Sequence, residues 1–171
     1  MKWQILFVLT LTGCSSLNFK HTVKHVDIPK FMGAWFVWAG RTTFLERDAH
    51  SSIEKYTWNE KEQRIDVDFT FRKDSFDGKE KRFPQKAWIY NTTTNAHWKV
   101  QPFWPLKFDY LIIDMDPDYK WTAIGVPSGA YLWIMGRAPI ASDEQIAEIV
   151  QRIKNLGYPV NDVIRVPQRS L

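Results

Sequence analysis

The stretch Ile65-Asp66-Val67-Asp68-Phe69-Thr70-Phe71-Arg72 alternates apolar and polar side chains without a break. Successive side chains of a β-strand point to opposite faces, so this stretch predicts a strand with one dry face and one wet face. Its four apolar side chains share the dry face, and the two acids, the threonine and the arginine share the wet one. The pattern indicates an antiparallel sheet that covers a core on one side.

Short runs rich in aromatic and β-branched residues recur on both sides of this strand, at intervals of about ten residues. The segments between them are rich in Asn, Asp, Gly and Pro, which favour turns. Strands are therefore expected near 34–41, 53–59, 64–72, 82–91, 96–104, 109–115, 120–126 and 131–137.

An amphipathic helix is expected after the last of these strands. Ser142 is its predicted N-cap, Gln145 completes a capping box, and Gly157 ends the helix as a left-handed cap. Apolar side chains fall at helical spacing on one side of it: Ile146, Ile149, Val150, Ile153 and Leu156. The run Leu111-Ile112-Ile113 is apolar on both parities, which requires a strand covered on both faces, for example by such a helix.

These elements predict an all-β fold. We expect an eight-stranded antiparallel up-and-down calyx barrel with one C-terminal α-helix packed outside, because eight strands close into a barrel just wide enough for one small ligand. A sandwich is the alternative, but it does not easily explain a single late helix with a full apolar stripe. Residues 27–32 predict one helical turn before the first strand, and residues 160–166 could add a short last strand.

The N-terminus carries an export pattern. A basic residue, Lys2, precedes an apolar run from Trp3 to Leu11, which is about half the ~20 residues that a membrane-spanning helix needs. Small residues and Cys14, the only cysteine in the chain, follow directly. A short apolar run that ends in small residues indicates a secretory signal.

The segment Leu11-Thr12-Gly13-Cys14 resembles the lipobox of bacterial lipoproteins. This resemblance implies cleavage after Gly13, lipidation of Cys14 and, with Ser15 next to it, sorting to the bacterial outer membrane on its periplasmic side. An ordinary signal peptide with a chance cysteine is the alternative. The chain then divides into a signal peptide (1–13), a polar tether (14–25) and one folded domain (26–171).

Composition narrows the class of protein further. The formal net charge is +4, and the basic residues are scattered, so nucleic-acid binding has little support. With Cys14 lipidated, no cysteine is left for a disulfide, and the domain must rest on its core. Nine Trp, eleven Phe and six Tyr are available to pack that core or to line a cavity.

Three segments resemble the signatures of the lipocalin family, in the family's order. They are Gly33-Ala34-Trp35, Asp116-Pro117-Asp118-Tyr119 and Tyr131-Leu132-Trp133-Ile134-Met135-Gly136-Arg137-Ala138-Pro139. The resemblance extends over essentially the whole mature chain. It implies that Gly33, Trp35, Asp116, Tyr119 and Arg137 are structural residues, with Trp35 closing the barrel floor and Arg137 lying over its indole.

The chain departs from the family directly after Trp35. Bacterial relatives usually carry Tyr-Glu-Ile-Ala-Arg there, whereas this chain has Phe36-Val37-Trp38-Ala39-Gly40 and then Arg41. Val37 shares the parity of Trp35, so an acid is lost from an inward position. We therefore expect a more apolar interior.

Alternation from the signature residues predicts which side chains face the interior. The candidates for ligand contact are Trp35, Val37, Ala39, Phe69, Phe71, Trp88, Trp98, Tyr110, Ile112 and Trp133. Core packing is the alternative role for each, and an error of one residue in register would turn a strand's set outward. Tyr110 and Trp133 are the expected polar handles, through a hydroxyl and an indole N–H.

Catalytic and metal-binding patterns are weak in this sequence. His21 and His25 lie in the expected tether, His50 and His97 are isolated, and the alternating acids 114–118 fit a turn better than a cation site. We therefore expect no metal, no cofactor and no catalytic residue.

The favoured function is that of a lipid-binding carrier or storage lipoprotein, anchored to the membrane through its N-terminus, with a homodimer possible. Its expected ligands are fatty acids such as palmitate, lysophospholipids or similar amphiphiles. One alternative is an enzyme on the same barrel, an isomerase or a reductase, which would need a titratable side chain deep inside. A second alternative is an interaction lipoprotein whose barrel is packed solid.

Overall fold

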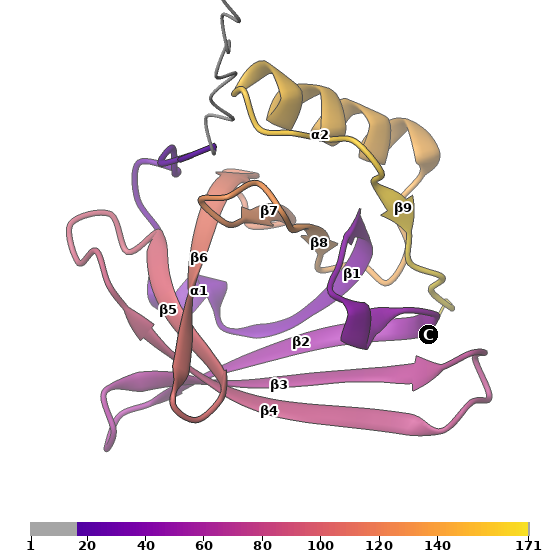
Figure 1. Cartoon of the computed structure of the whole chain (residues 1–171), viewed down its shortest axis with the longest axis horizontal. Coiled ribbons are helices and arrows are strands. Elements are labelled where there is room, and N and C mark those ends of the chain that lie inside the picture. The colour runs from indigo at the N-terminus through magenta and orange to yellow at the C-terminus, as the bar shows by residue number, and fades with distance from the viewer. Residues whose placement is uncertain (1–16, 171) are drawn as a thin grey trace, which may run out of the picture.

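Eight antiparallel strands close into a barrel in the computed structural model, which describes residues 17–170 (Figure 1). Each strand pairs with the next along the chain, and β1 pairs with both β8 and β2 to complete the closure. The predicted up-and-down barrel is confirmed, and the sandwich alternative is wrong. The strands are β1 (Gly33–Arg41), β2 (Ala49–Asn59), β3 (Arg64–Lys73), β4 (Glu80–Ile89), β5 (His97–Phe103), β6 (Leu106–Met115), β7 (Trp121–Gly125) and β8 (Leu132–Gly136).

Helix α2 (Asp143–Asn155) lies along the outside of the barrel (Figure 1). The Ser142 side chain accepts a hydrogen bond from the Gln145 amide, and Gly157 adopts the left-handed conformation predicted for the helix end. None of the helices in the described part of the chain is both long and apolar enough to cross a membrane.

Three short elements complete the fold. The helical turn α1 (Ile28–Phe31) begins at Asp27, whose carboxylate accepts a hydrogen bond from the Lys30 amide, as an N-cap does. The 3₁₀ helix η1 (Phe44–Glu46) follows β1 and was not predicted from the sequence. The short strand β9 (Ile164–Arg165) pairs with β1, which confirms the expected last strand.

The barrel wall separates two hydrophobic clusters. The inner cluster lies inside the barrel, and the outer cluster lies between the barrel and α2. Ile112 belongs to the inner cluster, whereas Leu111 and Ile113 belong to the outer one. A run that is apolar on both parities therefore marks the strand that α2 covers, as predicted.

The segment before α1 packs against the barrel. Phe19 is buried, its amide donates to the Pro127 carbonyl at 2.8 Å, and its ring meets that of Tyr158. The Val23 amide donates to the Ile112 carbonyl at 2.9 Å. The described part of the expected tether, residues 17–25, therefore contacts the barrel through Phe19 and Val23, while most of its polar side chains are exposed. Residues 1–16, including Cys14, lie outside the described part.

A C-terminal segment, residues 166–168, joins β1 to β2 where these strands part. Their pairing stops at Phe36 and Ile53. Beyond it, the Gln168 side-chain amide donates to the carbonyls of Val37 at 2.8 Å and Ser52 at 3.0 Å. The Ser51 amide donates to the Pro167 carbonyl at 2.8 Å. We call this junction the C-terminal seam.

Candidate functional site: the barrel interior

The floor of the barrel is built around Trp35 and Arg137. The guanidinium of Arg137 lies 3.8 Å from the centroid of the Trp35 ring, which confirms the predicted stack. Arg137 also donates to the backbone carbonyls of Lys30 at 2.7 Å and Ala34 at 2.8 Å. Gly33 has a φ of +99°, and a Cβ there would lie 3.2 Å from the guanidinium, so this position favours glycine.

The other signature residues hold turns at the same end. The Tyr119 hydroxyl accepts a hydrogen bond from the Asp27 amide at 2.8 Å and so ties the β6–β7 turn to α1. The Asp116 carboxylate accepts from the amides of Asp118 and Lys120 at 2.9 and 3.1 Å. These contacts explain the conformation of the segment without a cation.

Most of the predicted lining residues meet inside the barrel. Seven of the ten belong to the inner cluster, and Trp133 packs against it. The seven are Trp35, Val37, Phe69, Phe71, Trp98, Tyr110 and Ile112. Trp98 stacks on Tyr110 with ring centroids 5.4 Å apart and an interplanar angle of 10°. Alternation from the signature residues therefore predicts the inward face of most strands.

Two predicted lining residues, Ala39 and Trp88, face outward. The register of β1 shifts between Val37 and Ala39, and this bulge turns Ala39 into the cluster under α2. In β4, Ala87 stands opposite the buried Ile65 and takes the inward face, so Trp88 points away. The ammonium of Lys107 lies 3.9 Å from the centroid of the Trp88 ring. Pairing register, not aromatic size, decides which side chain enters the barrel.

A carboxyl group and two phenols form a polar centre inside the barrel: Glu54, Tyr56 and Tyr110. The Tyr56 hydroxyl donates to Glu54 Oε2 and lies 2.6 Å from the Tyr110 hydroxyl. Glu54 is only 8% exposed. Desolvation by burial raises the pKa of Glu54 to about 7, with a smaller contribution from the charge of Glu46, while the Tyr56 hydrogen bond opposes the rise.

The same burial raises the pKa of both phenols well above the usual value, so they stay protonated. Glu54 is not among the residues predicted from the sequence, although its strand carried a signal. Ser52, Glu54, Tyr56 and Trp58 share one parity of β2, and the two aromatic residues mark it as the inward one. The interior therefore carries an acid, Glu54, although Val37 replaces the acid that bacterial relatives usually have, and the expectation of a more apolar interior is corrected.

A second buried acid, Glu46, enters from η1. Its carboxylate accepts hydrogen bonds from the Trp133 indole at 2.9 Å and from the Thr43 amide at 2.8 Å. Desolvation by burial raises the pKa of Glu46, and these hydrogen bonds oppose the rise. The expected polar handle of Trp133 is thus bonded to Glu46, and that of Tyr110 lies beside Tyr56.

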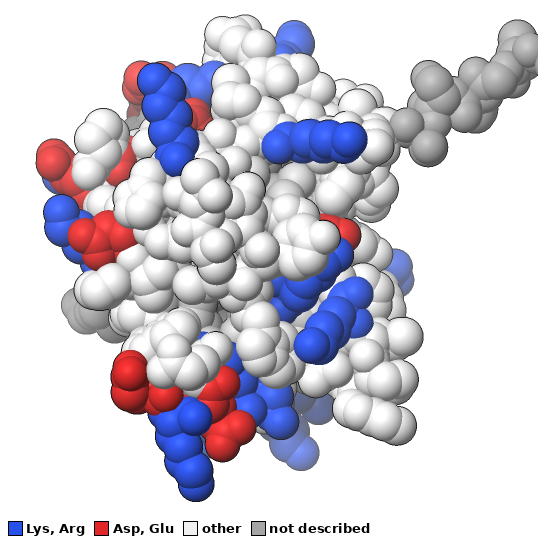
Figure 2. All heavy atoms as spheres, turned by 90° about the vertical axis from the view of Figure 1, so that its left-hand side faces the viewer, with Lys and Arg blue, Asp and Glu red and all other residues white. Residues whose placement is uncertain are grey.

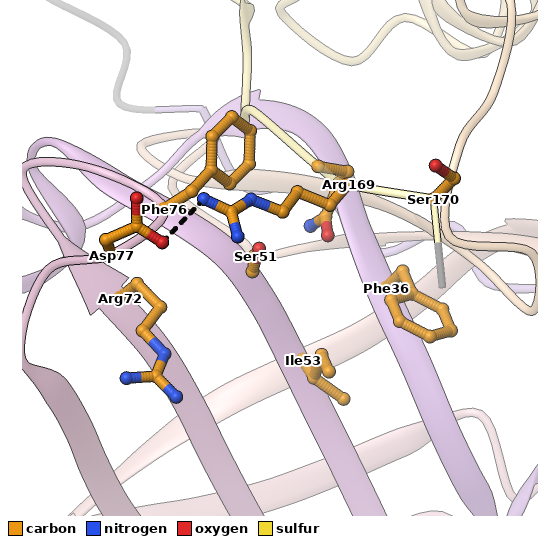
Figure 3. Close-up of a pocket in the computed structure, with 9 residues that line it drawn as sticks. Phe36, Ser51, Ile53, Arg72, Phe76, Asp77, Arg169 and Ser170 are labelled. Carbon is orange, nitrogen blue, oxygen red and sulfur yellow. Dashed lines mark hydrogen bonds and ion pairs between the residues drawn. The ribbon is translucent and has the colours of Figure 1, made fainter.

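A pocket of about 440 Å³ lies on the outer surface, beside the C-terminal seam (Figure 3). Phe36 and Ile53 supply apolar lining, and Arg72 and Arg169 supply charge. Both cations already have partners, because Arg169 meets Asp77 at 2.8 Å and Arg72 meets Glu80 at 3.3 Å. A second pocket of about 210 Å³ lies along the same C-terminal segment. Neither is lined by the polar centre.

Charges on the described surface are mixed. Figure 2 shows basic and acidic side chains interspersed on the side of the barrel that carries β5, around a broad uncharged area. His97 and Lys99 both contact the Asp109 carboxylate at 2.6 Å. Within residues 17–170, no group of three or more His, Cys, Asp and Glu side chains lies close enough to hold a metal ion.

The closed barrel, the Trp35–Arg137 floor and the single outer helix define a lipocalin. The chain belongs to this family, since residues 26–168 match the sequence model of the lipocalin-like domain.

Three comparisons illustrate the likeness. The chain is 24% identical to the outer membrane lipoprotein Blc of Vibrio cholerae over 169 residues, which is 96% of each chain. It is 25% identical to temperature-induced lipocalin-1 of Arabidopsis thaliana over 163 residues, 85% of this chain and 81% of the relative. Insecticyanin from the tobacco hornworm Manduca sexta shares the fold, with a TM-score of 0.65, 15% identity and coverage of 85% of this chain and 82% of that one. Fold and family together support a protein that binds hydrophobic ligands.

Proposed function

We propose that this protein is a carrier or storage protein for membrane-derived amphiphiles such as fatty acids or lysophospholipids. The observation that carries the proposal is the inner cluster, an aromatic and aliphatic lining on the inward face of a closed barrel. Phe83, Val100 and Trp133 pack against it and are only partly buried, so apolar surface remains for an acyl chain to cover.

The energetics suit reversible binding. Burial of an acyl chain of sixteen methylenes contributes a gross free energy of about 13 kcal/mol, at ~0.8 kcal/mol for each methylene. Ordering the chain and losing its free motion cost several kcal/mol. A dissociation constant of about micromolar or somewhat lower follows, which allows both capture and release.

The same proposal places the protein at the bacterial outer membrane, facing the periplasm. Residues 1–13 act as a lipoprotein signal and Cys14 carries the lipid anchor. Two or more acyl chains hold a protein firmly at a bilayer, whereas one chain holds it marginally. The likeness to an outer membrane lipoprotein over 96% of the chain supports this placement.

An enzyme on the same barrel would need a titratable side chain deep inside, and Glu54 is one. Within residues 17–170, its hydrogen-bonded network consists of the phenols of Tyr56 and Tyr110, which stay protonated. The neighbouring acid, Glu46, is hydrogen-bonded to Thr43 and Trp133 instead. We therefore propose binding rather than turnover.

Native mass spectrometry tests the proposal. The chain from residue 14 onward, with Cys14→Ser to prevent lipidation, keeps every residue that the structure describes. After lipid extraction it is exposed to a mixture of fatty acids and lysophospholipids. We expect one retained ligand per barrel and a change in tryptophan fluorescence on titration. A barrel that retains nothing would favour the solid-core alternative, and a ligand of altered mass would favour the enzyme. The same spectra report a homodimer.

A further inference from the structure

Two buried acids, Glu54 of the polar centre and Glu46, lie close to each other in the barrel interior. Glu54 stands directly opposite Trp35 across β1 and β2, well inside the barrel. Glu46 approaches from η1 closely enough for its charge to raise the pKa of Glu54. The Tyr56 and Tyr110 hydroxyls lie 2.6 Å apart at the same centre.

One oxygen of Glu54 is left for a ligand. Oε2 accepts from Tyr56, and within residues 17–170 no side chain donates to Oε1. Fully buried side-chain oxygens without a partner are absent from this part of the chain, so Oε1 keeps some accessible surface. Since Glu54 shares its face of β2 with Tyr56, that surface opens toward the interior.

The cations near this centre are already engaged or lie elsewhere. Arg137 belongs to the floor, where it stacks on Trp35 and donates to backbone carbonyls. Lys81 stands opposite the inward-facing Phe71, close to the β3–β4 turn, and it does not contribute to the pKa shift of Glu54. Within residues 17–170, a ligand carboxylate beside Glu54 would therefore meet negative charge, and the nearest guanidinium, that of Arg137, is already bound in the floor.

We propose that the interior prefers an amphiphile whose polar end is an ammonium group, held by Glu54 and the phenol hydroxyls, over a fatty acid of equal chain length. An ammonium supplies the donors that a carboxylate lacks, and it neutralises Glu54 in a site of low dielectric. Aromatic faces at the centre, among them Trp98 and Tyr110, add a favourable environment for a cation. The alkyl tail lies against Phe69, Phe71 and Phe83, whose rings pack together.

The preference rests on the proposed function and deepens it. The raised pKa of Glu54 gives the preference a dependence on pH, because an ionised Glu54 attracts an ammonium and repels a carboxylate. Glu46, Tyr56 and Tyr110 face the same centre, and both phenols stay protonated.

Three probes of equal chain length test the preference: dodecylamine, laurate and monolaurin, which is neutral. Their dissociation constants are measured by tryptophan fluorescence with the Cys14→Ser chain from residue 14 onward. At about pH 8, where Glu54 is ionised, we expect dodecylamine to bind about tenfold or more tightly than laurate. As the pH falls below about 7, laurate should bind more tightly and dodecylamine more weakly.

Two variants locate the effect. Glu54→Gln should remove most of the preference for dodecylamine, and Glu144→Gln, at an exposed acid in the first turn of α2, should leave it unchanged. Two results would overturn this inference: laurate binding as tightly as dodecylamine at about pH 8, or an unchanged ratio of their dissociation constants in Glu54→Gln. If monolaurin still binds, the proposed function stands. Failure of all three probes would overturn the proposed function with it. If Glu54→Gln does not fold, the pH dependence of the unsubstituted protein decides.

Discussion

Trp35 and Glu54 are direct cross-strand neighbours inside the barrel. The signature residue of the floor therefore stands beside the acid of the polar centre. Tyr56, which donates to Glu54, also packs against Phe31 of α1, with ring centroids 5.4 Å apart. The floor and the polar centre thus form one packed unit. Substitution of Arg137 in the floor tests the stability of this unit, and substitution of Glu54 in the polar centre tests which ligand it prefers.

Arg137→Ala should lower the free energy of unfolding by about 2 kcal/mol, because it removes the cation over Trp35 and its hydrogen bonds to backbone carbonyls. Arg137→Lys keeps the charge but loses the planar fork, so it should recover only part of the loss. Urea unfolding measures both. Ligand affinity should stay the same, and an unchanged midpoint in Arg137→Ala would show that the stack does not hold the floor.

Glu54 should make the protein less stable as pH rises from about 4.5 to about 7. Its pKa is higher in the folded state than in the unfolded state, so in this interval the folded protein holds a proton that unfolding releases. The contribution lost is about 3 kcal/mol at most. Urea midpoints at about pH 5 and about pH 8 should differ less in Glu54→Gln than in the unsubstituted protein. Equal differences in both proteins would contradict the assignment.

Gln168→Ala should destabilise the barrel by about 1–2 kcal/mol, because one side-chain amide donates to carbonyls of both β1 and β2. Arg169→Ala is the matched control. It breaks an exposed ion pair with Asp77 and should cost less than about 1 kcal/mol. Thermal unfolding compares the two. An equal effect from both substitutions would argue against a specific role for the C-terminal seam.

Trp98→Ala and Trp88→Ala make the same substitution on the inner and the outer face of the barrel. Trp98 is fully buried in the inner cluster, so its loss should cost about 3–5 kcal/mol. Trp88 lies outside under Lys107, and its loss should cost much less. Fluorescence should separate them as well, since ligand binding should alter the emission of Trp98 and leave that of Trp88 nearly unchanged.

Cys14→Ser should release the protein from membranes, because the proposed lipid anchor is attached there. Fractionation of bacterial cells that express either form, followed by immunoblotting, measures the distribution. Ser15→Asp retains the cysteine and should keep the protein on membranes while changing which membrane it reaches. Membrane association of Cys14→Ser equal to that of the unsubstituted protein would contradict the anchor.

Strand positions could be predicted because they depend on local chemistry. The alternation over 65–72 and the turn residues between runs reflect the geometry of single strands and short connections. Helix α2 could be predicted equally well, since the cap at Ser142, the apolar stripe and Gly157 lie within one short stretch. The floor pair Trp35–Arg137 came from a resemblance and not from periodicity.

The two mispredicted lining residues, Ala39 and Trp88, face outward for different reasons. In β4, regular pairing with β3 places Ala87, not Trp88, opposite the inward-facing Ile65. In β1, a register shift after Val37 reverses the face of Ala39. Such shifts arise from pairing between strands, and a single strand does not encode them.

A barrel of eight strands with one outer helix could be predicted from local pattern, because period-two alternation, turn residues and helix caps act over a few neighbouring residues. In contrast, the entry of Glu54 and Glu46 into the interior and the joining of β1 to β2 by residues 166–168 became visible only in the folded chain. These features depend on which distant segments meet, and burial then raises the pKa of the two carboxyl groups. Fold follows from local pattern here, whereas the chemistry of the interior follows from contacts between distant parts of the chain.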